Sequence, residues 1–235
     1  MSEQDVPMLI PLVQSCDCVV FGPGFGSNPE SLSAAAQLIP YFKKAVIDAD
    51  ALRPEIFDAL IQFNQSNASS KPLEIVLTPH YHELTRTASY FGINLPGSRK
   101  ELLPDELESA ALEISEKLGA AVLVKGREDL IANAGIVRYN ATGNAGMSVG
   151  GTGDVLAGIT GGLLAKNSAA AAACCGAYVC GKAGDSASEE KGDSLIPADI
   201  LDKVPLVFIG EVDSKTKKEA KKGNEKGNKK EIKKT

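Results

Sequence analysis

Residues 140–158 read NATGNAGMSVGGTGDVLAG and hold six glycines and one carboxylate, that of Asp154. The apolar residues within and after this stretch predict a helix over about residues 153–164. The first turn of a helix offers unpaired N–H groups and a partial positive charge, and glycine permits both a positive φ and close approach of a ligand. Gly150, Gly151, Thr152 and Gly153 therefore predict an anion hole suited to phosphate.

Asp154 lies just inside this predicted anion hole. A carboxylate next to bound phosphate is repelled by it, so a merely structural role would be costly. The helix dipole favours the ionised form of Asp154, which could then accept a proton from a substrate hydroxyl while the amides hold the phosphate being attacked. Phosphoryl transfer needs this arrangement. The alternative is a helix-capping aspartate in a tight turn.

Two common phosphate motifs are excluded by spacing. The stretch does not follow G-x-x-x-x-G-K-[ST], so it is not a P-loop. The segment GPGFGSN at residues 22–28 lacks the third glycine of the dinucleotide-binding fingerprint.

Strand and helix patterns alternate along the rest of the chain. Strands are expected at residues 16–22, 45–50, 73–79 and 120–126, and a β-hairpin at residues 130–141 turning around 133–135. Helices are expected at residues 28–44, 54–63, from about 80, at 105–118 and 169–186, with a short piece after Pro197. This order predicts an α/β fold with a mostly parallel sheet covered on both faces.

Unusual residues follow four of the predicted strands: GPGFG, DADAL, TPHYHE and KGRED. Ligands of such sheets bind beyond the carboxyl ends of the strands, so the four segments are expected to form one rim. Asp48 and Asp50 on this rim could bind Mg²⁺ through water, or they are turn aspartates at a strand end.

Lys125 ends a predicted strand at the rim, which favours a phosphate contact; the alternative is a solvated lysine. His80 begins a predicted helix, whose N-terminus disfavours the imidazolium form, so we expect a neutral, hydrogen-bonding side chain or a surface or capping histidine. His82 and Glu83 give no HExxH zinc pattern, and Glu83 is interpreted as a helix residue rather than a site residue.

Composition indicates a cytoplasmic globular protein. Hydrophobic residues make up 43% of the 235 residues, and no apolar run approaches the ~20 residues of a transmembrane helix. The N-terminus lacks a signal-peptide core. The cysteines have no usual zinc spacing and are expected to be buried or half-buried thiols: Cys16, Cys18, Cys174, Cys175 and Cys180.

Charge divides the chain into two parts. Residues 211–235 carry a net charge of +5 and almost no apolar residues, which leaves −10 for residues 1–210. We therefore predict one domain over residues 1–210 and a disordered Lys-rich tail over 211–235 that serves as a solubilising extension. No nucleic-acid or membrane partner is expected.

The segments NATGNAGMSVGGTGDVLAG, GPGFG, VIDADAL, LTPHYHEL and VLVKGRED together resemble the ADP-dependent NAD(P)H-hydrate dehydratases of the ribokinase-like superfamily. The resemblance spans residues 17–200. It implies a three-layer α/β/α fold with a mostly parallel central sheet. It also implies ADP-dependent dehydration of the S-epimer of hydrated NADH or NADPH, which restores the reduced nucleotide and releases AMP and phosphate. The hydrated nucleotide and ADP would be the substrates and Mg²⁺ the cofactor.

By this resemblance Asp154 is the base on the C6 hydroxyl of the hydrate. The family's adenine-nucleotide contacts match Gly153 and the segment Lys125, Gly126, Arg127, Glu128 and Asp129. Its hydrate contacts match Gly26 and His80, together with Asp154. Asn140 and Asn144 lie in the same motif but receive no role.

The chain departs from the family at its N-terminus. Members usually begin with further strand–helix units, which carry a glycine-rich segment and a stretch that touches the hydrate, whereas about sixteen residues precede the first predicted strand here. A shortened sheet is expected to expose an edge and an apolar face, which favours a homo-oligomer or a weakly active chain. Two alternatives stay open: another ribokinase-like small-molecule kinase, or a non-catalytic nucleotide-binding fragment.

Overall fold

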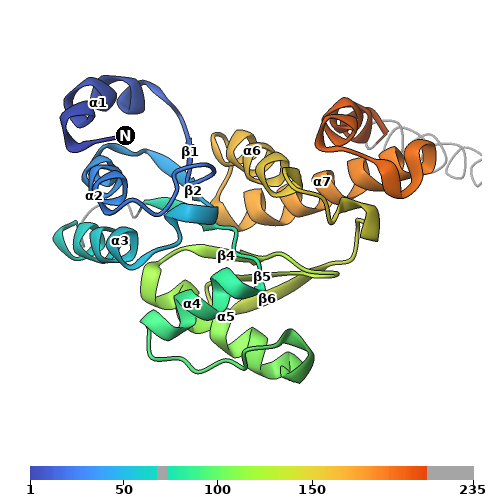
Figure 1. The fold of residues 1–235 in the computed structure, drawn as a ribbon, viewed down its shortest axis with the longest axis horizontal. Coiled ribbons are helices and arrows are strands. Elements are labelled where there is room, and N and C mark those ends of the chain that lie inside the picture. Colours follow the sequence, from blue (N-terminus) through green and yellow to red (C-terminus); the bar gives the residue numbers. More distant parts are fainter. Residues whose placement is uncertain (68–72, 211–235) are drawn as a thin grey trace, which may run out of the picture.

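The computed structural model describes residues 1–67 and 73–210; the predicted Lys-rich tail, residues 211–235, lies outside the described residues. Within the described part, six strands form a single sheet that carries helices on both faces (Figure 1). The predicted three-layer α/β/α architecture is confirmed.

The strands lie side by side in chain order. β1 to β4 are parallel neighbours, with Val20 beside Val46 and Val46 beside Val76, whereas β4, β5 and β6 are antiparallel. The predicted parallel sheet and its β-hairpin are therefore both confirmed. The strands are β1 (Val19–Phe21), β2 (Lys44–Ile47), β3 (Glu74–Leu77), β4 (Ala121–Val124), β5 (Asp129–Asn133) and β6 (Ile136–Asn140).

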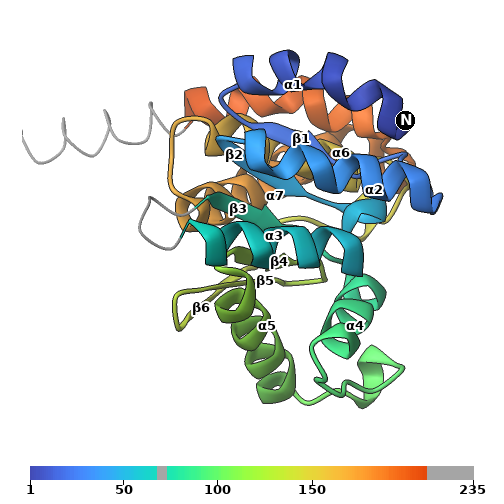
Figure 2. The same ribbon diagram turned by 90° about the vertical axis from the view of Figure 1, so that its left-hand side faces the viewer.

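The helices divide between the two faces of the sheet. Helices α1, α2 and α3 cover one face, while α6 and α7 cover the other (Figure 1 and Figure 2). A further helix includes residues 197–210. The helical bounds are α1 (Val6–Ser15), α2 (Pro29–Leu38), α3 (Pro54–Ser66), α4 (Tyr81–Tyr90), α5 (Pro104–Leu118), α6 (Thr152–Leu164) and α7 (Ala169–Lys191).

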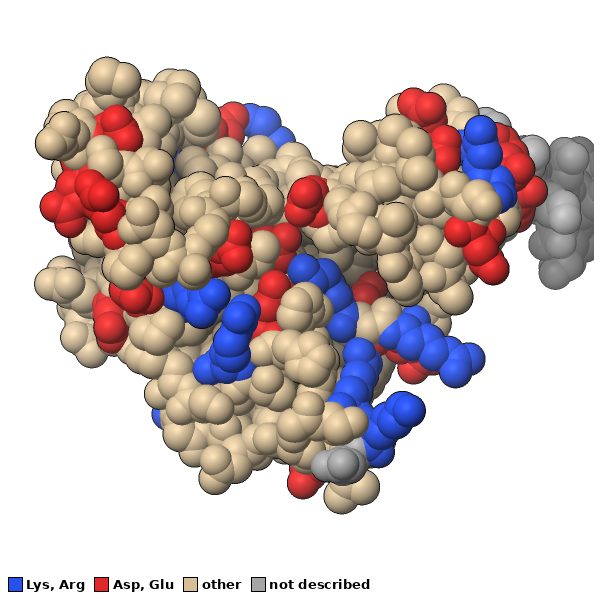
Figure 3. Space-filling model, in the orientation of Figure 1, with Lys and Arg blue, Asp and Glu red and all other residues tan. Residues whose placement is uncertain are grey.

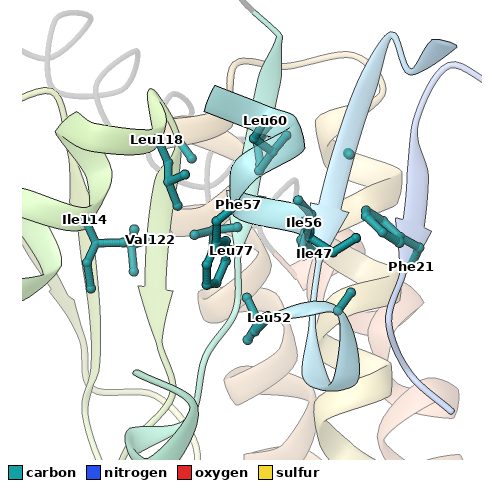
Figure 4. Packing of buried hydrophobic residues seen from close by; sticks show 14 of the residues in the cluster. Phe21, Ile47, Leu52, Ile56, Phe57, Leu60, Leu77, Ile114, Leu118 and Val122 are labelled. Carbon is teal, nitrogen blue, oxygen red and sulfur yellow. The ribbon is translucent and has the colours of Figure 1, made fainter. Parts of the chain in front are cut away.

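Two apolar cores follow from the alternation of side chains along the strands. Ala45 and Ile47 of β2 point into the core against α1, α2, α3 and α5, and Val46 between them points into the core against α6 and α7. Figure 4 shows the first core, where Phe57 of α3 and Ile114 of α5 pack against the strands. Because both faces of β2, β3 and β4 are buried, these strands read as nearly continuous apolar runs in the sequence.

Local sequence signals explain most of the helix boundaries. The Asn28 carboxamide oxygen accepts the N–H of Glu30 at 2.9 Å, which caps α2, and α2 ends just before a 3₁₀ turn, Ile39–Tyr41, that contains Pro40. α7 extends five residues past the expected end at residue 186, to Lys191, and stops where Gly192 adopts a φ of 60°.

Two expectations at the chain ends were incomplete. The sequence pattern gave no helix before residue 16, yet Val6–Ser15 is α1, with Pro7 in its first turn, Pro11 inside it, and Val6 and Val13 buried. The short piece expected after Pro197 is part of a helix that includes residues 197–210.

β1 forms one edge of the sheet among the described strands, and its Val20 is 39% exposed. None of the described helices is long and apolar enough to cross a membrane.

Candidate functional site

A pocket of about 830 Å³ opens between the β4–β5 turn, the loop after β6, and the helices α6 and α7. Its wall contains every residue that the sequence proposes for the nucleotide: Lys125, Gly126, Arg127, Glu128, Asp129 and Gly153. The loop after β6 supplies residues 141–145, and Leu156, Ala177 and Cys180 supply an apolar part. The pocket therefore joins segments far apart in the sequence around the start of α6.

The start of α6 has the form expected of an anion hole. Gly151 is the N-cap residue with a φ of 96°, a conformation that favours glycine. The Thr152 hydroxyl donates to the carbonyl oxygens of Met147 at 2.8 Å and Val149 at 2.9 Å, which fixes the turn. Among the described residues no acceptor binds the N–H groups of Gly153 and Asp154, so both remain available to a ligand.

Asp154 lies in the first turn of α6 with an exposed side chain. No described residue donates a hydrogen bond to its carboxylate or forms an ion pair with it. A capping aspartate would accept an N–H of its own turn. Asp154 is thus an exposed acceptor in the same turn as two unpaired amides.

Lys125 brings a positive charge to the same point. Its Nζ lies 2.8 Å from Oδ1 of Asp48 and 3.8 Å from Oε2 of Glu83, and its side chain is only 19% exposed. A Cβ placed on Gly153 would lie 3.5 Å from Nζ, so the ammonium faces the start of α6. The alternative of a solvated strand-end lysine is wrong.

Asp48 and Asp50, offered by the sequence as Mg²⁺ contacts, both have hydrogen-bond donors. Buried Asp48 accepts from the Thr78 hydroxyl and from Lys125, each at 2.8 Å, while Asp50 accepts the N–H of Gly26 at 2.9 Å. Across residues 1–67 and 73–210 no group of three His, Cys, Asp or Glu could hold a metal ion. This donor set fits a Mg²⁺ ion that keeps its waters and is held mainly by nucleotide phosphates.

His80 and Glu83 cap the start of α4 together. The N–H of His80 donates to Glu83 Oε2 at 2.7 Å, and the N–H of Glu83 donates to His80 Nδ1 at 3.2 Å. Since Nδ1 accepts, the neutral ring carries its proton on Nε2, which lies 3.3 Å from Glu83 Oε1. His80 is thus the surface and capping histidine that the sequence left open as the alternative, and Glu83 is a buried partner of Lys125 as well as a helix residue.

The rim predicted from the four strand ends is confirmed by these contacts. Gly26 follows β1, Asp48 follows β2, His80 follows β3 and Lys125 follows β4, and each pair of adjacent segments is joined. Gly22, with a φ of 119°, lies so close to β2 that a Cβ there would overlap the carbonyl oxygen of Asp48. Figure 3 shows basic and acidic side chains around a hollow near the centre of the molecule.

Asn140 and Asn144, left without roles by the sequence, organise the loop after β6. The Asn140 amide donates to Asp129 Oδ2 at 3.0 Å, and the Asn144 amide donates to Asp185 Oδ1 at 3.2 Å. Burial raises the pKa of Asp129, although the hydrogen bonds from Asn140 and Gly126 oppose this shift.

Sequence reasoning missed several residues of the site. Thr78 reads as a strand end, Asp185 lies on α7, far along the chain from the loop that it holds, and Arg99 lies in a long connection. Arg99 donates to the Lys125 carbonyl at 3.3 Å and lies over Gly126, where a Cβ would overlap its guanidinium. Contacts across the fold identify these residues: Arg99 and Asp185 lie outside the motifs, and Thr78 opens the TPHYHE segment, where it was read only as a strand end.

The cysteines are free thiols. As expected, Cys180 is buried and Cys16, Cys18 and Cys174 are half-buried, but Cys175 is exposed because it faces outward from α7. Burial raises the pKa of Cys180 to about 12 and that of Cys18 to about 11. Both are therefore inert thiols at neutral pH.

Comparison with known proteins places this site in a family. The family model of NAD(P)H-hydrate dehydratases matches residues 1–206. A bifunctional NAD(P)H-hydrate repair enzyme of Methanocaldococcus jannaschii is 36% identical over 209 residues, covering 88% of this chain and 36% of that protein. One from Methanospirillum hungatei is 39% identical over 204 residues, covering 87% and 37%. The chain spans little more than a third of these curated relatives.

Solved structures agree on the fold. A ribokinase-like superfamily protein of Enterococcus faecalis matches with a TM-score of 0.66 at 26% identity, covering 89% of this chain and 69% of that one. An ADP/ATP-dependent NAD(P)H-hydrate dehydratase of Bacillus subtilis, co-crystallised with ATP and Mg²⁺, matches with a TM-score of 0.63 at 23% identity, covering 88% and 76%. Together with the family model over residues 1–206, these findings show that the chain belongs to the NAD(P)H-hydrate dehydratase family and has the ribokinase-like fold.

Proposed function

We propose that this chain catalyses the ADP-dependent dehydration of the S-epimer of hydrated NADH or NADPH, restoring NADH or NADPH. The proposal rests on family membership and on one observation. The unpaired amides of Gly153 and Asp154 and the exposed carboxylate of Asp154 share the first turn of α6, and the ammonium of Lys125 lies beside Gly153. An anion hole next to an unpaired base suits the transfer of a phosphoryl group to a hydroxyl.

The nucleotide would occupy the 830 Å³ pocket, with its transferring phosphate at the start of α6. Gly153 and the segment from Lys125 to Asp129 would contact it. The Lys125 ammonium has three donors, and one is used on Asp48, so it could also bind a phosphate oxygen. ADP is proposed as the co-substrate; the Bacillus subtilis neighbour is described as ADP/ATP-dependent.

The hydrate would lie over the rim beside Gly26 and His80, with its C6 hydroxyl at Asp154. Asp154 would take the hydroxyl proton as the oxygen attacks the terminal phosphorus of ADP. The phosphorus–oxygen bond to AMP breaks, and the amides of α6 and Lys125 hold the developing negative charge. The ring nitrogen then supplies electrons as the C6–O bond breaks and phosphate leaves, and loss of the C5 proton restores the double bond.

Mg²⁺ bound to the phosphates would neutralise their charge during transfer. The residues of this chain that would approach it are Asp48 and Asp50, through water, because their hydrogen bonds to Thr78, Lys125 and Gly26 hold both carboxylates at the rim.

Several properties of the whole protein belong to the same proposal. Residues 1–210 would form the catalytic domain, and residues 211–235 a solubilising extension. The exposed Val20 on edge strand β1 supports a homo-oligomer. The acidic charge of the body, −10 against a chain total of −5, disfavours nucleic acid as a partner, and the location that belongs to this proposal is the cytoplasm.

The experiment is to incubate the full chain with hydrated NADH, Mg²⁺ and either ADP or ATP, and to follow the near-ultraviolet absorbance of NADH. We expect the absorbance to return with ADP, together with equimolar AMP and phosphate. A stable phosphorylated product would instead indicate a kinase, and ADP binding without turnover would indicate a non-catalytic nucleotide-binding chain. Either of these results contradicts the proposal.

A further inference from the structure

The loop from Thr142 to Met147 forms one wall of the nucleotide pocket and is held by side chains outside it. Asp185 of α7 accepts two hydrogen bonds from this loop: the Gly143 N–H donates to Oδ2 and the Asn144 side-chain amide donates to Oδ1, each at 3.2 Å. Gly143 has a φ of 103°, so the carboxylate binds the loop where its backbone adopts a conformation that favours glycine.

The side chain of Asn144 links Asp185 to the turn that follows. Its side-chain oxygen accepts the N–H of Gly146 at 3.1 Å and caps the 3₁₀ turn Ala145–Met147. One carboxylate therefore fixes both the bend at Gly143 and, through Asn144, the turn that leads toward the start of α6.

Two glycines of α7 provide the surface on which the loop lies. A Cβ on Gly181 would overlap the hydroxyl of Thr142, and a Cβ on Gly184 would overlap the sulfur of Met147. The Thr142 hydroxyl also lies 3.3 Å from the carbonyl oxygen of Tyr178. The loop thus packs directly on the backbone of α7, with Asp185 at the end of this glycine surface.

We propose that Asp185 is a positioning residue that orders the pocket wall before the nucleotide binds. This inference rests on the proposed function for its consequence, since a pre-ordered wall lowers the entropic cost of binding ADP. Loss of the carboxylate removes both of these hydrogen bonds from the pocket wall and should weaken ADP binding by roughly 10- to 100-fold.

The test compares Asp185→Ala and Asp185→Asn with Glu189→Ala, which removes an exposed carboxylate from the same helix. Hydrogen–deuterium exchange is measured on the nucleotide-free full chain, and the dissociation constant of ADP by calorimetry. In Asp185→Ala we expect faster exchange confined to residues 142–147, a higher KM for ADP and a nearly unchanged kcat. Asp185→Asn, which keeps one acceptor oxygen, should be intermediate, and Glu189→Ala should match the parent chain.

Unchanged exchange at residues 142–147 in Asp185→Ala would overturn the proposal, as would an increase spread evenly over α7. The exchange measurement needs no nucleotide. If the parent chain fails to bind ADP, the proposed function fails, and the exchange pattern still decides the role of Asp185.

Discussion

At the scale of single residues, the site depends on one lysine shared by two buried acids. The side chains of Asp48 and Glu83 are 2% and 8% exposed, and both face Lys125. A buried charge without a partner is costly, so the three groups hold one another in place. Lys125 is therefore positioned by the ends of β2 and β3 rather than by its own strand alone.

Glu83 allows a prediction that separates its two roles. Glu83→Ala removes the acceptor for the His80 N–H and should lower the free energy of unfolding by about 1–2 kcal/mol. Glu83→Gln keeps an acceptor and leaves a neutral Asp48–Lys125 pair, so it should recover most of that loss. Urea denaturation monitored by circular dichroism measures both, and equal destabilisation by the two variants would contradict the prediction.

The residue scale also shows where the sequence is informative. The GGTGD core predicts a phosphate site because glycines precede a helix whose first amides are unpaired, and the KGRED segment predicts one because its lysine follows a buried strand. From the sequence, Glu83 was interpreted only as a helix residue, and Thr78, Arg99 and Asp185 received no role. Their contacts arise only when distant segments of the chain meet.

At the scale of elements, α6 is the helix that creates the site. Its N-cap, Gly151, has a φ of 96°, and a Cβ there would lie 2.9 Å from Cγ of Pro197. Both features fix how the chain enters the helix, and hence where the unpaired amides of Gly153 and Asp154 point.

Gly151→Ala should therefore destabilise the protein by about 1–2 kcal/mol from the left-handed conformation alone, and should weaken ADP binding. The matched control is Gly162→Ala in the same helix, where an added Cβ meets nothing within 4 Å. That control should stabilise the helix by up to about 1 kcal/mol. Urea denaturation measures the free energy of unfolding of both variants. An unchanged free energy of unfolding in Gly151→Ala would show that the strained turn is not required.

Elements with strong local signals were predictable, and those with weak ones were not. Asn28 and Pro29 mark the start of α2 by capping chemistry, and the apolar strand runs mark β2 to β4. α1 was missed because Pro7 and Pro11 interrupt a short apolar run, and it is stabilised by the burial of Val6 and Val13 against the core. Tertiary packing of this kind leaves little trace in a local pattern.

At the scale of the whole molecule, the parallel sheet collects four strand ends at one rim, and the start of α6 lies beside Lys125 of that rim. The rim could be predicted because strand order and loop chemistry agree. The pocket itself required the structure, since its wall combines the β4–β5 turn, residues 141–145, 147 and 148, and parts of α6 and α7. The same fold serves many reactions, so the proposed reaction depends on Asp154 and its surroundings.

The most direct test of this account is the turnover of Asp154→Asn, measured by the return of NADH absorbance at saturating ADP, alongside the dissociation constant of ADP. The substitution keeps the size of the side chain and removes the base, so we predict a loss of turnover of about 10²–10⁴-fold with ADP binding unchanged or tighter. Turnover close to that of the parent chain would show that Asp154 is not the base and would contradict the central claim.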